Sequence, residues 1–245
     1  MSQPPGAVPA TGRPRVRWGL PDVLFAWIAG LVVSVLAGVV VIGIGDIPSD
    51  QASDDVGVLL ASVVGQAIGV IGALWLIARW KGRGSLRADF GLAVRARDWV
   101  WLAGGIGLQI ATTIALLPIV NLHGEDDAQE VVQQFEDARG LQVVLFSLVV
   151  VLVAPLAEEL LFRGALLRSL QRRMAPAWAI FLSALIFALV HPLASPTIGS
   201  VMAVPALLVL GLVSANAAVR TGSLSASILL HAGYNLLTAI VISAS

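Results

Sequence analysis

The sequence contains no cysteine and little charge. Among its 245 residues only 12% are charged, and fifteen basic residues balance fifteen acidic ones. The absence of cysteine excludes disulfides, thiolate metal sites and a cysteine nucleophile. The neutral balance gives no support to a nucleic-acid surface, so nucleic acid is not an expected partner. Any catalysis by this chain must therefore use oxygen or imidazole groups.

Apolar residues dominate what is present. They make up 58% of the chain, a share typical of a polytopic membrane protein and not of a soluble domain. A helix needs about 20 apolar residues to cross the hydrocarbon core of a bilayer, and runs of that order recur along the whole chain. We predict an all-α transmembrane helical bundle of about seven spans. The expected spans cover residues 22–45, 56–78, 99–120, 141–167, 177–191, 201–219 and 224–243.

The charged residues are sorted between the loops. Thirteen of the fifteen basic residues fall in the N-terminal tail and in the second, fourth and sixth loops, whereas ten of the fifteen acidic residues fall in the first and third loops. Because short cytoplasmic loops retain arginine and lysine, we expect the tail and the basic loops to face the cytosol. Seven spans then place the N-terminus inside and the C-terminus outside. The bias toward arginine over lysine points to a GC-rich, bacterial genome, so we expect a multi-pass protein of the bacterial plasma membrane.

The chain divides into three parts. Residues 1–19 hold several prolines and glycines and three arginines, and we expect them to form a disordered basic tail. We expect residues 20–125 to form a three-span region and residues 140–245 to form a four-span core. The apolar stretch after the tail is too long for the core of a signal peptide, so we expect it to remain as the first span.

Three charged residues lie inside the fourth span. Glu158, Glu159 and Arg163 stand in an otherwise apolar segment, where each charge costs about 2.5–3.5 kcal/mol at mid-bilayer. Glu159 and Arg163 are spaced i and i+4, so they share one helix face and can pair as a structural brace. Glu158 points about 100° away from Glu159 on an α-helix and is left free for another role.

Two further polar pairs follow at the same helical spacing. Phe187 and His191 are i and i+4, and Pro192 is expected to end or kink that helix. His231 and Asn235 place an imidazole and an amide on one face of the last span. Taken alone, each pair is more often a helix-packing contact than a catalytic group. Together, a carboxylate, two imidazoles and an amide on three helices are the groups that a water-activating site requires.

These motifs, in this order and on consecutive apolar segments, resemble the CPBP family of intramembrane proteases, which includes the type II CAAX prenyl endopeptidases and bacterial Abi proteins. The resemblance covers roughly residues 140 to 240. It implies that Glu158 activates the attacking water and that His191 holds and polarises this water. His231 and Asn235 would stabilise the oxyanion, and Glu159 and Arg163 would brace the site.

The participation of a metal stays open at this point. Glu158, His191 and His231 could equally form a His₂Glu zinc set with water in the fourth position. The HExxH arrangement of soluble zinc proteases is absent. We favour a reaction without a metal, in which the glutamate alone activates the water.

The depth of the two histidines raises a geometric difficulty. Counted from the cytosolic ends of their spans at about 1.5 Å per residue, His191 lies roughly 10 Å deeper than His231. A fifth span that starts deeper, or a long or kinked fourth helix around Pro155, would bring them together. Residues 192–200 are expected to be mostly irregular and to line a water-filled cavity.

We therefore expect an intramembrane endopeptidase that acts on a membrane-associated protein or peptide. The alternative is a non-catalytic membrane protein, such as an immunity factor or a transporter-like helper, in which the same polar network packs helices or relays protons. A relay needs acids spread across the membrane, whereas Glu158 and Glu159 lie on one turn. This placement favours the enzyme.

Overall fold

The computed structural model describes residues 16–53, 55–93, 95–123, 140–194 and 198–244, and within these ranges every regular element is a helix. The predicted all-α membrane bundle is confirmed. The N-terminal residues 1–15 and the acidic third loop, at 124–139, lie outside the described residues.

Six of the seven predicted spans are helices long and apolar enough to cross a bilayer. The seventh, α12, is also an apolar helix, and its apolar stretch covers Leu224–Ile240. The long helices are α1 (Leu20–Gly45), α2 (Val56–Lys81), α4 (Val100–His123), α9 (Pro176–Ala194), α11 (Val204–Thr221) and α12 (Leu224–Ala244), together with the composite helix 141–171. Three short elements connect them: α3 (Leu86–Phe90), η1 (Ala96–Trp99) and α10 (Ile198–Met202).

The fourth span is one long helix whose hydrogen-bond pattern changes along its length. It consists of α6 (Leu141–Leu148), η2 (Val149–Val153), α7 (Ala154–Glu159), η3 (Leu160–Leu166) and α8 (Leu167–Gln171), in which η2 and η3 are π-helical. Such π turns are rare and often mark functional sites. The expected long fourth helix is thus present, and α7 with its two glutamates lies between two π-helical stretches.

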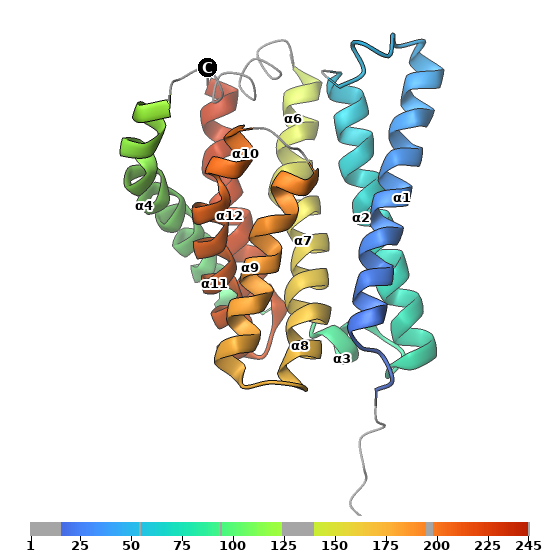
Figure 1. Cartoon of the computed structure of the whole chain (residues 1–245), viewed down its shortest axis with the longest axis vertical. Helices are drawn as coiled ribbons and strands as arrows, with labels where there is room; N and C mark the ends of the chain where they lie inside the picture. Colours follow the sequence, from blue (N-terminus) through green and yellow to red (C-terminus); the bar gives the residue numbers. More distant parts are fainter. Residues whose placement is uncertain (1–15, 54, 94, 124–139, 195–197, 245) are drawn as a thin grey trace, which may run out of the picture.

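The long helices alternate in direction (Figure 1). The connections from α2 to α4, from α8 to α9 and from α11 to α12 lie at the same end of the bundle as the start of α1, and the C-terminus lies at the opposite end. The basic loops therefore share one end, because every second loop of alternating helices lies on the same side. The odd number of helices places the two termini at opposite ends. The assignment of that end to the cytosol stays a prediction from the charge pattern.

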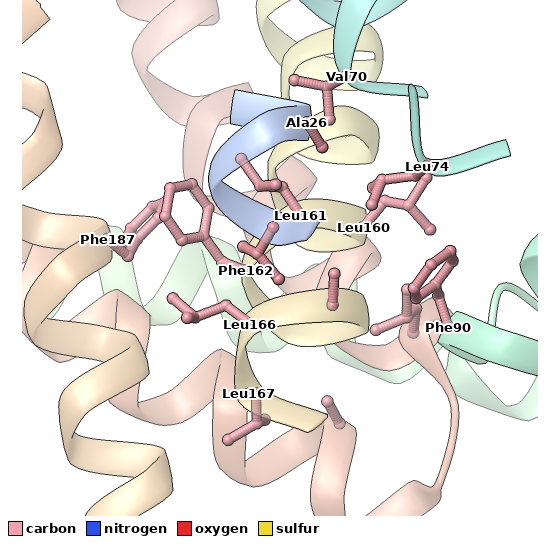
Figure 2. Close-up of a cluster of buried hydrophobic side chains, with 14 of the residues drawn as sticks. Ala26, Val70, Leu74, Phe90, Leu160, Leu161, Phe162, Leu166, Leu167 and Phe187 are labelled. Carbon is pink, nitrogen blue, oxygen red and sulfur yellow. The ribbon is translucent and has the colours of Figure 1, made fainter. Parts of the chain in front are cut away.

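Helix α7 and the π-helical stretch η3 lie at the centre of the packing. Figure 2 shows the side chains of Leu160, Leu161 and Phe162 among residues of α1, α2 and α9. Leu160 is fully buried, as is Arg163 on the next turn. The helix that carries the glutamates is therefore held on several sides, which fixes its rotation about its own axis.

The end of the predicted tail is ordered, which corrects the expectation of disorder over residues 16–19. Trp18 is 4% exposed, its indole Nε1 donates to Asp89 Oδ1 at 3.0 Å, and the Arg172 guanidinium lies 4.1 Å from its ring centroid. The backbone N–H of Arg17 also donates to the Lys81 carbonyl at 2.8 Å. A large aromatic residue that finds an apolar seat and a partner for its N–H orders the chain around it.

Pro192 does not end its helix, contrary to the sequence expectation. Helix α9 continues to Ala194, and α10 begins at Ile198, so residues 192–194 and 198–200 are helical and not irregular. Proline removes only its own N–H bond, and this loss is tolerated so close to a helix end, where the chain is about to turn.

Candidate active site

Glu159 and Arg163 form the ion pair expected from their spacing. Arg163 Nη1 lies 3.0 Å from Glu159 Oε1, and both side chains are fully buried. Arg163 also donates from Nη2 to the Gly211 carbonyl of α11 at 3.2 Å, and its guanidinium lies 4.3 Å from the Phe187 ring centroid. One arginine thus ties the glutamate helix to α11 and α9.

His231 connects the two glutamates. Its Nδ1 lies 3.0 Å from Glu159 Oε1, and its Nε2 lies 3.8 Å from Glu158 Oε2. Because an ionised carboxylate only accepts hydrogen bonds, Nδ1 carries a proton and donates a hydrogen bond to Glu159. The other ring nitrogen then faces Glu158, so a single imidazole spans both acids.

Glu158 differs from Glu159 in its access to solvent. Its side chain is 30% exposed, whereas that of Glu159 is fully buried. Glu158 faces a cavity of about 350 Å³ between five segments of the bundle. The cavity is lined by Trp27, Leu31, Val63, Gln66, Ala67, Val70, Val150, Ala154, Ala157, Glu158, Leu161, Phe162, Val190, His191, Leu193 and Asn235.

His191 lines this cavity, and a hydrogen bond within its own helix sets its tautomer. Its Nδ1 lies 2.8 Å from the Phe187 carbonyl one turn earlier, and because a carbonyl only accepts, Nδ1 carries the proton. A neutral His191 then presents the lone pair of Nε2 as an acceptor. The interaction fixes the ring orientation within the same helix.

Asn235 joins the cavity from α12. Its Nδ2 donates to the Val150 carbonyl in the π-helical stretch η2 at 2.9 Å. In a π turn the backbone hydrogen bonds join residues i and i+5, so the carbonyls that accept within the helix differ from those of an α-helix. An amide nitrogen carries two hydrogens, so Asn235 keeps one N–H that this contact does not use.

These groups lie in the part of the chain that comparison with known proteins identifies. Residues 140–237 match the family described as "Rce1-like: Type II CAAX prenyl endopeptidase Rce1-like". The expected resemblance to the CPBP family is confirmed. The Rce1-like segment contains Glu158, Glu159, Arg163, His191, His231 and Asn235.

A curated relative gives a second similarity. An "Uncharacterized 24.3 kDa protein" from Escherichia coli is 30% identical over 131 residues, which are 54% of this chain and 58% of the relative. The chain thus covers somewhat more than half of that protein. No solved structure matches the chain.

The structure gathers three of the four expected catalytic residues around one cavity, and His231 is not among the residues that line it. Glu158, His191 and Asn235 line the cavity, whereas His231 is 3% exposed and lies within 4 Å of both glutamates. The sequence placed His191 deeper in the membrane than His231. In the structure the Phe187 ring lies next to both, with its centroid 4.9 Å from that of His191 and 5.7 Å from that of His231.

The zinc set left open by the sequence, Glu158, His191 and His231, is not grouped in this structure. In the described part of the chain, no three His, Asp or Glu side chains are grouped as metal ligands. The Nδ1 of each imidazole is engaged, by the Phe187 carbonyl and by Glu159, which leaves Nε2 as the ring nitrogen open to another group. We therefore derive no step through a metal.

Sequence reasoning missed the contribution of α1 and α2. Trp27 and Leu31 from α1, and Gln66 with its neighbours from α2, line the cavity although they lie outside the Rce1-like segment. The cavity expected near residues 192–200 touches Val190, His191 and Leu193 but also extends along α1, α2 and the fourth span. A signal was present in the sequence, because Gln66 is an isolated amide in the middle of an apolar span.

Proposed function

We propose that this protein is an intramembrane endopeptidase in which Glu158 activates a water molecule. The observation that carries the proposal is the contrast between two adjacent acids that share one imidazole. Glu159 is closed off and paired with Arg163, whereas Glu158 faces a cavity with His191 and Asn235. The Rce1-like match over residues 140–237 supports the same reading.

Water activation uses two cavity-facing groups that can accept a hydrogen bond from water. A water between Glu158 and His191 would donate one hydrogen to the carboxylate and the other to the free Nε2 of His191. Glu158 takes the first proton as the water oxygen attacks the carbonyl carbon of the scissile bond. His191, oriented by its bond to the Phe187 carbonyl, holds the water without taking its proton.

Asn235 is the oxyanion donor in this mechanism. Its unused N–H is available to the oxygen that becomes negative in the tetrahedral intermediate, while the bond to Val150 holds the amide in place. The protonated Glu158 then gives its proton to the leaving nitrogen as the carbon–nitrogen bond breaks. The products are a carboxylic acid and an amine, and Glu158 returns to its ionised state.

His231 positions Glu158 in this scheme and does not contact the substrate. Its bond to Glu159 sets the tautomer and leaves Nε2 as an acceptor, 3.8 Å from Glu158 Oε2, where it faces the carboxyl group that takes the proton of the water. Groups that orient a catalytic side chain in this way sharpen its geometry. Glu159 and Arg163 hold His231 in turn, which extends their expected role as a brace.

The substrate in this proposal is an apolar peptide or membrane-protein segment. Most residues that line the cavity are hydrophobic, and they belong to helices long enough to span a bilayer. Small-molecule and peptide sites commonly combine such apolar walls with a few polar groups. Prenylated CAAX tails are the substrate named by the family description, and they are one class to include in a test.

The test is cleavage of a membrane-peptide library by the purified, detergent-solubilised protein. We expect the wild type to cleave, and Glu158→Gln to lose cleavage by a factor of at least about 100 while its thermal stability stays close to wild type. The matched variant is Arg163→Ala, which should lower the free energy of unfolding by about 3–5 kcal/mol because Glu159 is left as a buried unpaired charge.

Two results would overturn the proposal. Equal loss of folding in Glu158→Gln and Arg163→Ala would make Glu158 a structural residue. Cleavage that a zinc chelator abolishes and added zinc restores would replace the metal-free mechanism with a metalloprotease. Cleavage that survives the chelator but not Glu158→Gln is the expected outcome.

A further inference from the structure

Helix α2 contributes one polar side chain to the cavity. Gln66 lies near the middle of α2, and Val63, Ala67 and Val70 line the same cavity on the same side of that helix. Trp27 and Leu31 of α1 continue this wall. Gln66 is therefore an isolated amide on an otherwise apolar surface that faces Glu158's cavity.

The amide has no partner within the described structure. Gln66 is half-buried, and among the described residues its carboxamide makes no hydrogen bond. Leaving an amide without a partner in an apolar environment costs about 1–3 kcal/mol on protein scales, and in membrane helices such groups usually bond across to a neighbouring helix. The other mid-span glutamine, Gln109 of α4, does so, since its Nε2 donates to Thr238 at 3.2 Å.

Helix packing does not account for Gln66 either. The contact between α1 and α2 is made through small residues: a Cβ on Gly69 would lie 2.6 Å from the Ala29 carbonyl oxygen, and one on Gly65 would lie 2.8 Å from the Val33 carbonyl oxygen. At Gly30 a Cβ would lie 2.6 Å from Val70 Cγ2 but 3.5 Å from Gln66 Cγ, which is an ordinary contact distance. The close approach of α1 and α2 therefore does not depend on the Gln66 amide.

We infer that Gln66 binds the main chain of the substrate. This inference rests on the proposed endopeptidase function and assigns a substrate-binding role to the helices outside the Rce1-like segment. A carboxamide offers one acceptor and two donors, the same groups that a peptide unit requires. A peptide drawn into an apolar cavity loses its water, so a peptide N–H or C=O that met no partner there would carry the full cost of desolvation.

The expected chemistry is a pair of hydrogen bonds between Gln66 and one peptide group away from the scissile bond. Such bonds form when the substrate binds and persist in the transition state. They would therefore affect KM and leave kcat largely unchanged. This distinguishes Gln66 from Glu158, whose substitution acts on kcat.

The experiment compares Gln66→Met with Gln109→Met in the full-length protein. Methionine keeps the length of the side chain and removes its hydrogen bonds. With a peptide that the wild type cleaves, we expect Gln66→Met to raise KM by about three- to tenfold and to retain kcat. Gln109→Met should leave both constants unchanged. Thermal stability of Gln66→Met should be equal to or above that of wild type, because an unpaired amide is removed.

A scan with single N-methylated peptide bonds locates the partner. At one position, methylation should raise KM for the wild type and have no further effect on Gln66→Met, as a double-mutant cycle requires of groups in contact. Unchanged KM in Gln66→Met, or an additive effect of methylation at every position, would overturn the assignment.

Binding to an inactive background separates this inference from the proposed function. Fluorescently labelled peptides of the library are titrated into Glu158→Gln with and without Gln66→Met. Weaker binding in the double variant, in the absence of any cleavage by wild type, would uphold Gln66 as a peptide-binding residue and overturn the endopeptidase. Cleavage by wild type, with equal peptide binding by Glu158→Gln and by the double variant, would uphold the endopeptidase and overturn the role of Gln66.

Discussion

His231 lies next to both glutamates. Its two ring nitrogens face Glu159 at 3.0 Å and Glu158 at 3.8 Å. The two acids are neighbours in the chain, and an ideal helix would point them about 100° apart. An imidazole placed between them can reach both, because its nitrogens lie on different edges of the ring.

Two amide substitutions separate the functions of these nitrogens. In His231→Asn, the amide N–H stands near the position of Nδ1 and keeps a donor for Glu159, whereas in His231→Gln it stands near the position of Nε2. We expect His231→Asn to lower cleavage by about 100-fold with stability close to wild type. His231→Gln should lower the free energy of unfolding by about 1–3 kcal/mol, because Glu159 loses a buried hydrogen bond.

Thermal unfolding and peptide cleavage measured side by side check this pair. The same loss of stability in both variants would show that the ring serves only as packing. Retained cleavage in His231→Asn would mean that Glu158 needs no neighbour at Nε2.

At the scale of single residues, the sequence predicted contacts within one helix well. The spacing of Glu159 and Arg163, and that of Phe187 and His191, placed each pair on one face, and the structure shows both contacts. The bond between His231 and Glu159 joins positions 72 residues apart and could not be read from spacing. It depends on which faces of α7 and α12 meet.

The crossing of α4 and α12 sets the position of the helix that carries His231 and Asn235. A Cβ on Gly233 would lie 2.0 Å from the Leu102 carbonyl oxygen, and one on Gly105 would lie 1.9 Å from the Leu230 carbonyl oxygen. The backbones therefore approach as closely as glycine allows, which is typical of membrane helix pairs. A hydrogen bond of 3.0 Å between the hydroxyls of Thr112 and Tyr234 closes the same contact.

We expect Gly233→Ala to force these two helices apart. The clash is with backbone atoms, which cannot rotate away, so the free energy of unfolding should fall by about 1–3 kcal/mol. Cleavage should fall as well, since Gly233 lies between His231 and Asn235. Gly107→Ala is the matched control, because a Cβ there meets nothing within 4 Å. Equal thermal unfolding of the two variants would contradict the role of this crossing.

The sequence also predicted the elements better than their ends. The expected fourth span, 141–167, corresponds to the helix 141–171, but its π-helical stretches left no pattern in the sequence. Helix α9 passes through Pro192 although proline usually predicts a helix end. Pro192 is tolerated because it lies two residues before the end of α9, where the loss of one N–H bond costs little.

The whole molecule has an orientation that the charge pattern predicts and a direct measurement can establish. The chain has no cysteine, so single cysteines can be introduced without a background. Asp50 lies in the expected outer loop and Arg87 in an expected cytosolic loop, and both are exposed. Because basic loops stay in the cytosol, a maleimide that cannot cross the membrane should label Asp50→Cys in intact cells.

Arg87→Cys is the counterpart in the same measurement. It should be labelled only after the membrane is permeabilised, since Arg87 lies at the end of the bundle that carries the basic loops. Labelling of Arg87→Cys in intact cells, with Asp50→Cys protected, would reverse the topology and place the basic end outside.

The sequence by itself determined the class of the protein, the position of its apolar helices and the face on which each local polar pair lies. Hydropathy and the period of the α-helix decide these properties, and both depend only on residues near one another in the chain. The same reasoning found the polar pairs inside the Rce1-like segment, because their members are spaced i and i+4.

Only the tertiary structure decided which helices meet around the site. Residues that face lipid and residues that face a neighbouring helix are both apolar, so composition does not distinguish the inner face of α1 or α2 from the outer one. The wall formed by Trp27, Leu31 and Gln66, and the place of His231 behind Glu158, follow instead from close packing between segments far apart in the chain.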